Sequence, residues 1–188
     1  MKKTFRNLCL ATIVACVPLT ADDYVKSLVG FEGGYGKLNV ETSPTPIEKK
    51  RLNVGHGGIK IGAETKNVRL FLNANYIDGD NIDNAIIYGA SLQYLFNVSK
   101  YMNFFLGANA GIADIRLEDL NRNAIKYRKG YYGADAGMNF HFTESFDFEA
   151  GVRHSKMQDK QTVAGVTYEL RDHTTAYGSF IFKFNLDK

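Results

Sequence analysis

The sequence contains only two cysteines and three prolines, has no tryptophan and lacks a long apolar run. Both cysteines, Cys9 and Cys16, lie near the N-terminus. The prolines are Pro18, Pro44 and Pro46, so no proline interrupts the chain after residue 46. That absence is compatible with a continuous β-ladder, because proline cannot donate a backbone hydrogen bond to it. After residue 21 no run of 18 apolar residues occurs, which excludes a transmembrane helix.

The N-terminal residues have the pattern of a secretory signal peptide. Basic side chains at Lys2, Lys3 and Arg6 precede a short apolar segment, and the small residue Ala21 follows it. We expect residues 1–21 to be the signal peptide and residues 22–188 to form one mature barrel domain. The tetrapeptide that ends at Cys16, Ile-Val-Ala-Cys, also resembles the lipobox of bacterial lipoproteins, so lipidation of Cys16 stays open.

Cleavage after Ala21 would change two properties of the chain. Both cysteines would be lost, which leaves the exported protein without disulfides or thiol chemistry. Three basic residues and no acidic residue would also be lost, so the formal charge of +3 would fall to near neutrality. We therefore expect no nucleic-acid partner.

Alternation with a period of two organises the rest of the chain, and it is clearest in residues 102–112. One face of this segment carries Met102, Phe104, Leu106, Ala108, Ala110 and Ile112. The other face carries Asn103, Phe105, Gly107, Asn109 and Gly111. Because successive strand residues point to opposite sides, this pattern predicts a strand with one apolar face and one small or polar face. The segment is long enough to cross a bilayer core as a tilted strand, which takes about 9 to 11 residues.

Seven other stretches repeat this design. They cover approximately residues 26–40, 52–64, 68–76, 88–96, 132–142, 146–153 and 175–185. Short turns are expected at residues 65–67, 97–100 and 143–145. Long loops are expected at residues 42–51, 116–130 and 157–172, and another opens at residues 78–81. This alternation of long and short connections predicts an all-β fold, an eight-stranded up-and-down antiparallel transmembrane β-barrel.

The apolar faces carry aromatic side chains near both ends of the predicted strands, as expected for girdles at two membrane interfaces. The band near the short turns contains Tyr94, Phe96, Tyr101, Phe140, Phe142, Phe146, Phe182 and Phe184. The band toward the long loops contains Tyr35, Tyr76, Tyr88 and Tyr132. A soluble lipocalin-like barrel would instead turn its apolar face inward around a ligand. The charged residues on the opposite face argue against that alternative, because Lys and Glu are rarely buried in an apolar core.

At this level the chain resembles the small eight-stranded outer-membrane barrels of Gram-negative bacteria, the group that includes OmpX and the barrel domain of OmpA. The resemblance covers residues 26–186 and rests on the architecture, the signal peptide and the aromatic last strand, Phe180-Ile181-Phe182-Lys183-Phe184. Such barrels commonly end on an aromatic residue, whereas this chain continues to Lys188. The resemblance implies a monomer in the outer membrane, with short turns and both termini periplasmic and four extracellular loops.

Charged residues on the polar faces would lie in the lumen of such a barrel. They are Glu32, Lys60, Arg69, Asp135, Glu149, Arg153 and Lys183. We expect opposite charges at similar depth to pair, since isolated buried ions are very unfavourable. An eight-stranded barrel is only wide enough for its own side chains, so we predict a static polar core. A narrow ion channel or porin-like conduit remains an alternative.

Basic residues gather in the expected first and third loops. They are Lys49, Lys50, Arg51, Arg122, Lys126, Arg128 and Lys129. Such a patch is suited to contact lipopolysaccharide phosphates, and long loops are suited to bind a host or cell-surface ligand. The sequence therefore predicts an integral outer-membrane protein with a structural or adhesin-like surface role.

The sequence predicts no catalytic, cofactor or metal site. His154 and Ser155 resemble the His and Ser of outer-membrane lipid A deacylases, but strand alternation places these neighbours on opposite faces. A lipid A-modifying enzyme is kept as the competing class. The remaining histidines, His56, His141 and His173, lack ligand spacing. The acidic loop residues Asp78, Asp80 and Asp83 do not have EF-hand spacing, which favours a solvated turn.

Overall fold

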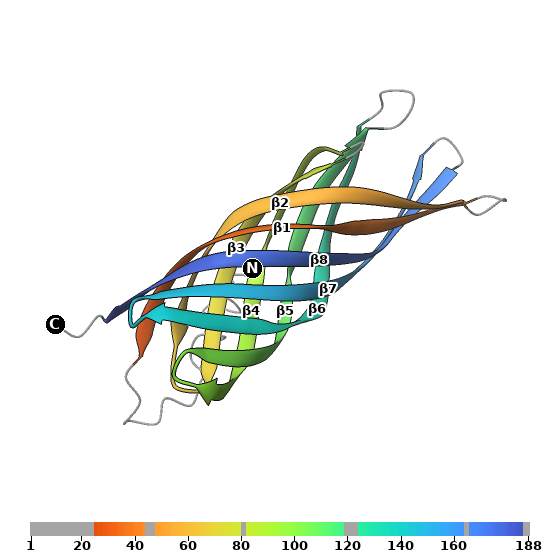
Figure 1. The fold of residues 1–188 in the computed structure, drawn as a ribbon. Helices are drawn as coiled ribbons and strands as arrows, with labels where there is room; N and C mark the ends of the chain where they lie inside the picture. Colours follow the sequence, from red (N-terminus) through yellow and green to blue (C-terminus); the bar gives the residue numbers. More distant parts are fainter. Residues whose placement is uncertain (1–24, 44–47, 80–81, 119–123, 164–165, 186–188) are drawn as a thin grey trace, which may run out of the picture.

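The computed structural model describes residues 25–43, 48–79, 82–118, 124–163 and 166–185, and these form eight strands. The strands are β1 (Lys26–Ser43), β2 (Glu48–Glu64), β3 (Val68–Gly79), β4 (Ile82–Ser99), β5 (Met102–Glu118), β6 (Ala124–Thr143), β7 (Phe146–Val163) and β8 (Val166–Asn185). Each strand pairs antiparallel with its sequence neighbours, and β8 pairs with β1, so the sheet closes into a barrel (Figure 1). The predicted eight-stranded up-and-down barrel is confirmed. Within these residues no helix has the length and apolar character needed to cross a membrane.

Alternation along each strand sorts the side chains between the lumen and the outer wall. In β5, Asn103 and Phe105 are buried in the lumen, whereas Phe104 and Leu106 are 43% and 58% exposed on the outside. Every strand contributes exposed large apolar side chains, among them Val29, Ile59, Leu72, Leu92, Leu106, Tyr132, Val152 and Phe180. This distribution is the reverse of a soluble barrel, so the lipocalin-like alternative is wrong.

The strands are longer than the sequence pattern predicted at one end of the barrel. The β5–β6 ladder continues to the pair Glu118 and Ala124, and the β7–β8 ladder to Val163 and Val166. The long loops predicted at residues 42–51, 116–130 and 157–172 are therefore wrong, because strand residues fill most of these ranges.

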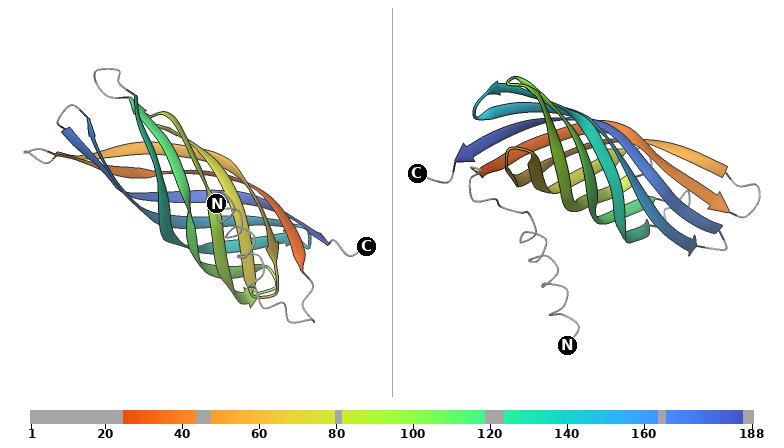
Figure 2. Two further views of the ribbon diagram at one scale, coloured as in Figure 1. Left: turned by 180° about the vertical axis from the view of Figure 1, so that it is seen from behind. Right: turned by 90° about the horizontal axis from the view of Figure 1, so that it is seen from below.

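Figure 2 shows the barrel from behind and from below, with the start of β1 and the end of β8 at the same end. The turns at residues 65–67, 100–101 and 144–145 lie at the end where β1 begins and β8 ends, which we call the short-turn end. The opposite end, where the strands overrun the predicted boundaries, is called the extended end.

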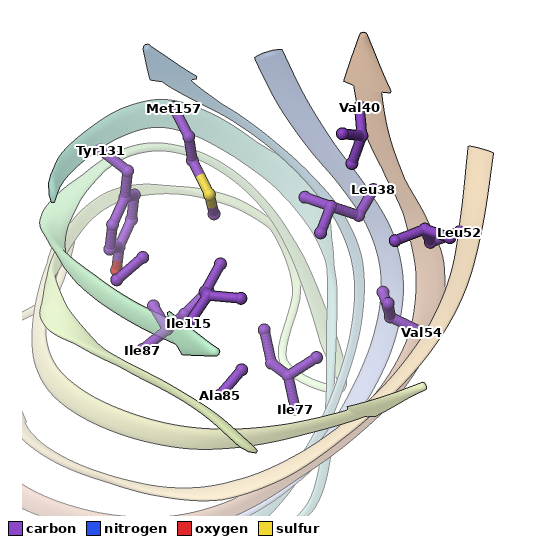
Figure 3. Close-up of a cluster of buried hydrophobic side chains, with 11 residues drawn as sticks. Leu38, Val40, Leu52, Val54, Ile77, Ala85, Ile87, Ile115, Tyr131 and Met157 are labelled. Atoms are coloured by element: carbon purple, nitrogen blue, oxygen red, sulfur yellow. The ribbon is translucent and has the colours of Figure 1, made fainter. Parts of the chain in front are cut away.

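The polarity of the two faces reverses toward the extended end. Inside the barrel, the apolar cluster comprises Leu38, Val40, Leu52, Val54, Ile77, Ala85, Ile87, Ala113, Ile115, Tyr131 and Met157 (Figure 3). On the outer wall at this end, exposed charged residues are Lys37, Arg51, Asp78, Arg116, Arg128 and Lys156. Nearer the short turns the outside is apolar and the inside is charged. This reversal is expected where the wall leaves lipid and enters water, beyond the level of Tyr35 and Tyr132.

Glycines on the inward faces make room for large lumen side chains. A Cβ atom on Gly62 would lie 2.0 Å from the Leu70 carbonyl oxygen and 2.7 Å from the Phe71 ring. By contrast, a Cβ atom on the outward-facing Gly57 would meet nothing closer than 4.0 Å. The inward glycines therefore let the lumen hold rings without widening the barrel.

Candidate functional site: the charged lumen and the basic outer wall

Ion pairs fill the lumen from the short-turn end upward. Arg69 is fully buried, and its guanidinium contacts the carboxylates of Glu64, Asp147 at 3.2 Å and Glu149 at 3.0 Å. The ammonium of Lys183 lies 2.9 Å from Glu64 and 2.7 Å from Asp147. These contacts connect β2, β3, β7 and β8 across the lumen, which compensates part of the desolvation of each charge.

A second set of contacts continues this network at mid-height. Lys60 donates to Glu149 at 2.8 Å and to Glu32 at 3.4 Å. The two Nη atoms of Arg153 donate to the two carboxylate oxygens of Glu32, at 2.7 and 3.1 Å. His56 Nε2 lies 3.2 Å from the same carboxylate. All of the predicted lumen charges except Asp135 are thus brought into one connected set of ion pairs.

Asp135 is held by the side-chain amides of Gln93 and Asn109. Gln93 and Asn109 donate to its two carboxylate oxygens at 2.9 and 3.3 Å. Asn109 in turn accepts a hydrogen bond of 3.0 Å from Ser155. The sequence interpretation did not include these amides among the site residues. Strand alternation places them on the inward faces, and that position could have identified them. They matter because a buried polar group needs hydrogen-bond partners to offset its desolvation.

Aromatic rings complete the solvation of the buried cations. The Lys60 ammonium lies 4.7 Å from the centre of the Phe71 ring, and the Arg153 guanidinium lies 4.5 Å from the centre of the Tyr177 ring. Both rings point into the lumen and are buried. Cation–π contacts of this kind are stronger when the cation is desolvated. The lumen is therefore filled by charges, amides and rings rather than by charges alone.

Two cavities border this network. A cavity of about 670 Å³ opens at the short-turn end, where Lys26, Lys66, Lys100 and Glu144 contribute to its lining. It also borders Lys183, which is part of the ion-pair network. A much smaller cavity of about 20 Å³ lies between the network and the apolar cluster. The larger space is a vestibule below the packed centre of the lumen.

The predicted loop patch lies on strands instead of loops. Lys49, Lys50 and Arg51 are in β2, and Lys126, Arg128 and Lys129 are in β6, so their assignment to loops is wrong. The physical reason is that strand pairing continues beyond the aromatic band, where charged residues face water. Arg122 falls outside the described residues, as do the side chains of Lys49, Lys50 and Lys126.

Arg51 and Arg128 of this patch join other exposed cations on the same wall. We define the outer basic band as Lys37, Arg51, Arg116, Arg128 and Lys156. Arg128 donates to the Tyr88 hydroxyl at 3.2 Å. Beside that hydroxyl, a surface groove of about 180 Å³ is lined by Ile86, Tyr88, Asp114 and Arg116. The outer basic band thus places guanidinium groups next to Tyr88, which belongs to the aromatic band nearer the extended end.

His154 and Ser155 point to opposite faces of β7, as alternation predicts. His154 Nδ1 lies 2.8 Å from the Thr174 hydroxyl on the exposed wall, whereas Ser155 is buried and donates to Asn109 in the lumen. They cannot act as a nucleophile and its base, which requires hydrogen-bond contact.

The sequence also predicts no metal site. Across the described ranges, no group of three or more His, Cys, Asp or Glu side chains is arranged to hold a metal ion. Of the acidic residues in the predicted second loop, Asp78 accepts from the backbone N–H of Gly79 at 3.0 Å. Asp80 and the side chain of Asp83 lie outside the described residues.

Residues 8–178 match the outer membrane protein beta-barrel domain family, and the chain belongs to that family. It is therefore a transmembrane β-barrel of the outer membrane, and its apolar outer wall and polar lumen agree with that class.

Solved structures with the same fold include Neisserial surface protein A, with a TM-score of 0.63 and 16% identity over 84% of this chain and 97% of that chain. The N-terminal barrel domain of OprF from Pseudomonas aeruginosa has a TM-score of 0.55 and 18% identity, over 84% and 97% of the two chains. OprH of the same organism has a TM-score of 0.54 and 18% identity, over 85% and 99%. No curated protein matches the sequence significantly.

Proposed function

We propose that this barrel is a non-catalytic, monomeric surface protein that interacts with lipopolysaccharide through the outer basic band. In this proposal the extended end is extracellular, and the short turns and chain ends are periplasmic. The observation that carries the proposal is the position of the band, directly beyond the tyrosines that mark one edge of the apolar wall. Phosphate groups of lipid A would lie at that level in the outer leaflet.

The chemistry of the band suits phosphate recognition. Guanidinium groups form paired hydrogen bonds with phosphate oxygens, and they are less strongly hydrated than ammonium groups. Arg116 lines the surface groove beside Tyr88, and Arg128 donates to the Tyr88 hydroxyl from β6. A lipid phosphate in this groove would contact Arg116 and lie beside Arg128, which is bonded to the Tyr88 hydroxyl. Each basic side chain near an anionic membrane surface contributes about 1 kcal/mol.

The binding experiment compares two matched double variants. Arg116→Gln with Arg128→Gln removes two cations of the band, and Lys66→Gln with Lys100→Gln removes two exposed cations of the short-turn end. Lipopolysaccharide is titrated into each refolded barrel in neutral detergent micelles. At about 1 kcal/mol per cation the first variant should bind about 30-fold more weakly, and the second should match the wild type. Equal weakening of both variants would mean general charge attraction and would contradict the proposal.

Orientation has its own test, because no cysteine occurs among the described residues. Lys37→Cys places a thiol on the outer wall of the extended end, and Lys66→Cys places one in a short turn. A membrane-impermeant maleimide applied to intact cells should label the first variant only. Labelling of Lys66→Cys alone would reverse the proposed orientation.

An adhesive role would reside at the tips of the extended end. Replacing the connections at residues 44–47, 80–81, 119–123 and 164–165 with short glycine-serine linkers should lower cell attachment while leaving folding intact. Attachment equal to that of cells with the wild-type barrel would restrict the proposal to a structural and lipid-binding role.

The two competing functions make different predictions. An enzyme acting on lipid A would change the acyl pattern of lipid A, so mass spectra from cells with and without the gene should be identical under our proposal. A narrow channel would conduct ions, and its conductance should change in Arg153→Ala because that side chain pairs across the lumen with Glu32. We expect planar-bilayer recordings of both proteins to stay at the baseline.

A further inference from the structure

The small cavity between the ion-pair network and the apolar cluster has a mixed lining. Its volume is about 20 Å³, and polar side chains border it at His56, Asn75, Arg153, Ser155, His173 and Thr175. The rest of its wall belongs to the apolar cluster. The cavity therefore lies where the interior changes from charged to apolar.

Three polar atoms of these lining residues have no hydrogen-bond partner within the described chain. They are the carbonyl oxygen Oδ1 of Asn75, Nε of Arg153 and Nε2 of His173. Asn75 and His173 are only 5% and 6% exposed. Both Nη atoms of Arg153 are already bonded to Glu32, so Nε is the guanidinium nitrogen that lacks a partner among the described residues. Buried polar atoms of this kind are rarely left without a partner, because desolvation is then uncompensated.

The volume of the cavity and the polar atoms around it indicate which molecule can occupy it. One water molecule needs about 10 to 15 Å³ of such space and usually makes about three hydrogen bonds when buried. Water can accept from Arg153 Nε and donate to Asn75 Oδ1, and it can either donate to or accept from His173 Nε2. An anion would be repelled by the Asn75 carbonyl oxygen, and a cation by the Arg153 guanidinium.

We propose that this cavity binds one ordered water molecule that joins Asn75 on β3, Arg153 on β7 and His173 on β8. The water completes the hydrogen bonding at the upper boundary of the polar lumen, and the apolar cluster beyond it stays dry. This site is independent of the lipopolysaccharide interaction, because its residues are buried inside the barrel. Asn75 is held over Gly58, where an added Cβ would lie 2.2 Å from Asn75 Oδ1.

A high-resolution crystal structure of the wild-type barrel tests the site directly. We expect a density peak within hydrogen-bond distance, about 2.7 to 3.2 Å, of all three atoms. Asn75→Leu should remove the peak, because it replaces the acceptor with an apolar side chain of similar size. Asn73→Leu is the matched control on the same strand and face, and it should keep the peak because Asn73 does not line the cavity.

A solution measurement covers the case in which variants do not crystallise. Magnetisation transfer from water to the Arg153 Nε proton should be seen in the wild type and in Asn75→Asp, which keeps an acceptor oxygen. It should be lost in Asn75→Leu, after unboiled gel mobility has shown that this variant is folded. An empty cavity in the wild-type map, or transfer that persists in folded Asn75→Leu, would overturn the proposal.

Discussion

Replacing Arg69 with methionine should destabilise the barrel by about 3 kcal/mol. Removing one partner from a buried ion pair typically costs about 3 to 5 kcal/mol, because the other charge stays buried. Arg69 contacts two carboxylates that are themselves fully buried, Asp147 and Glu149. Each keeps another cation, Lys183 for Asp147 and Lys60 for Glu149, so the lower end of that range applies. Three kcal/mol corresponds to a change of about 160-fold in the folding equilibrium constant.

The assay is reversible urea unfolding in detergent micelles or vesicles, followed by circular dichroism because the chain has no tryptophan. Arg116→Met is the matched control, since it makes the same substitution at an exposed position of the outer wall. Surface changes of this kind usually stay within about 0.5 kcal/mol. The double variant Arg69→Met with Glu149→Gln should be less unstable than the sum of the single variants. If Arg69→Met falls within about 1 kcal/mol of Arg116→Met, well below the cost expected when a buried ion pair is broken, the network does not support the fold.

Three further substitutions test the packing and the position of the membrane, the first two by urea unfolding in lipid vesicles and the third by gel mobility. Gly62→Ala should lower the free energy of unfolding by about 1 to 3 kcal/mol, because its Cβ would overlap a backbone oxygen. Gly57→Ala should leave the free energy of unfolding unchanged, and equal effects of the two substitutions would contradict the packing argument. Ile61→Arg, on the lipid-facing wall, should lower the free energy of unfolding by about 2 to 4 kcal/mol. Asn53→Arg, on the same face beyond the aromatic band, should lower it by less than about 1 kcal/mol. Comparable losses would place the polarity reversal inside the membrane. Val54→Asp puts an unpaired charge in the apolar cluster and should prevent the unboiled gel shift of the folded barrel; normal mobility would show that the cluster admits water.

The membrane-facing part of the fold could be predicted from the sequence because one rule applies throughout it. From Met102 to Ile112 the outward residues are apolar and the inward residues, apart from Phe105, are small or polar, and the structure has the same assignment. Strand alternation is local, so a single strand reveals it without knowledge of its neighbours. The number of strands and their antiparallel order then follow from the turns.

The extended end could not be predicted by the same rule, because the rule reverses there. In β5, Ala113 and Ile115 point inward, while the exposed Arg116 follows on the outer face. Alternation persists across this boundary, but its meaning changes as the solvent changes from lipid to water. The interpretation that treated charge as a sign of loops therefore ended the strands too early.

Partners in the lumen depend on strand register and tilt, which a single sequence does not reveal. Lys60 and Glu149 are 89 residues apart and belong to β2 and β7, which are not neighbours in the sheet. Their contact exists only because the closed barrel brings distant strands across a narrow interior. The inward face of each residue was predictable, but its particular partner was not.

The packing of the lumen limits where a function can reside. Ion pairs, amides and rings fill the lower and middle interior, and the apolar cluster fills the extended end. An ion that crossed the barrel would have to displace paired charges and then enter an apolar layer, and each step carries a large desolvation penalty. The outer wall has no such barrier, because its cations are already exposed to water beside the lipid surface. Loss of lipopolysaccharide binding in the Arg116 and Arg128 double variant, with unchanged stability, would therefore separate the proposed function of this barrel from the interactions that fold it.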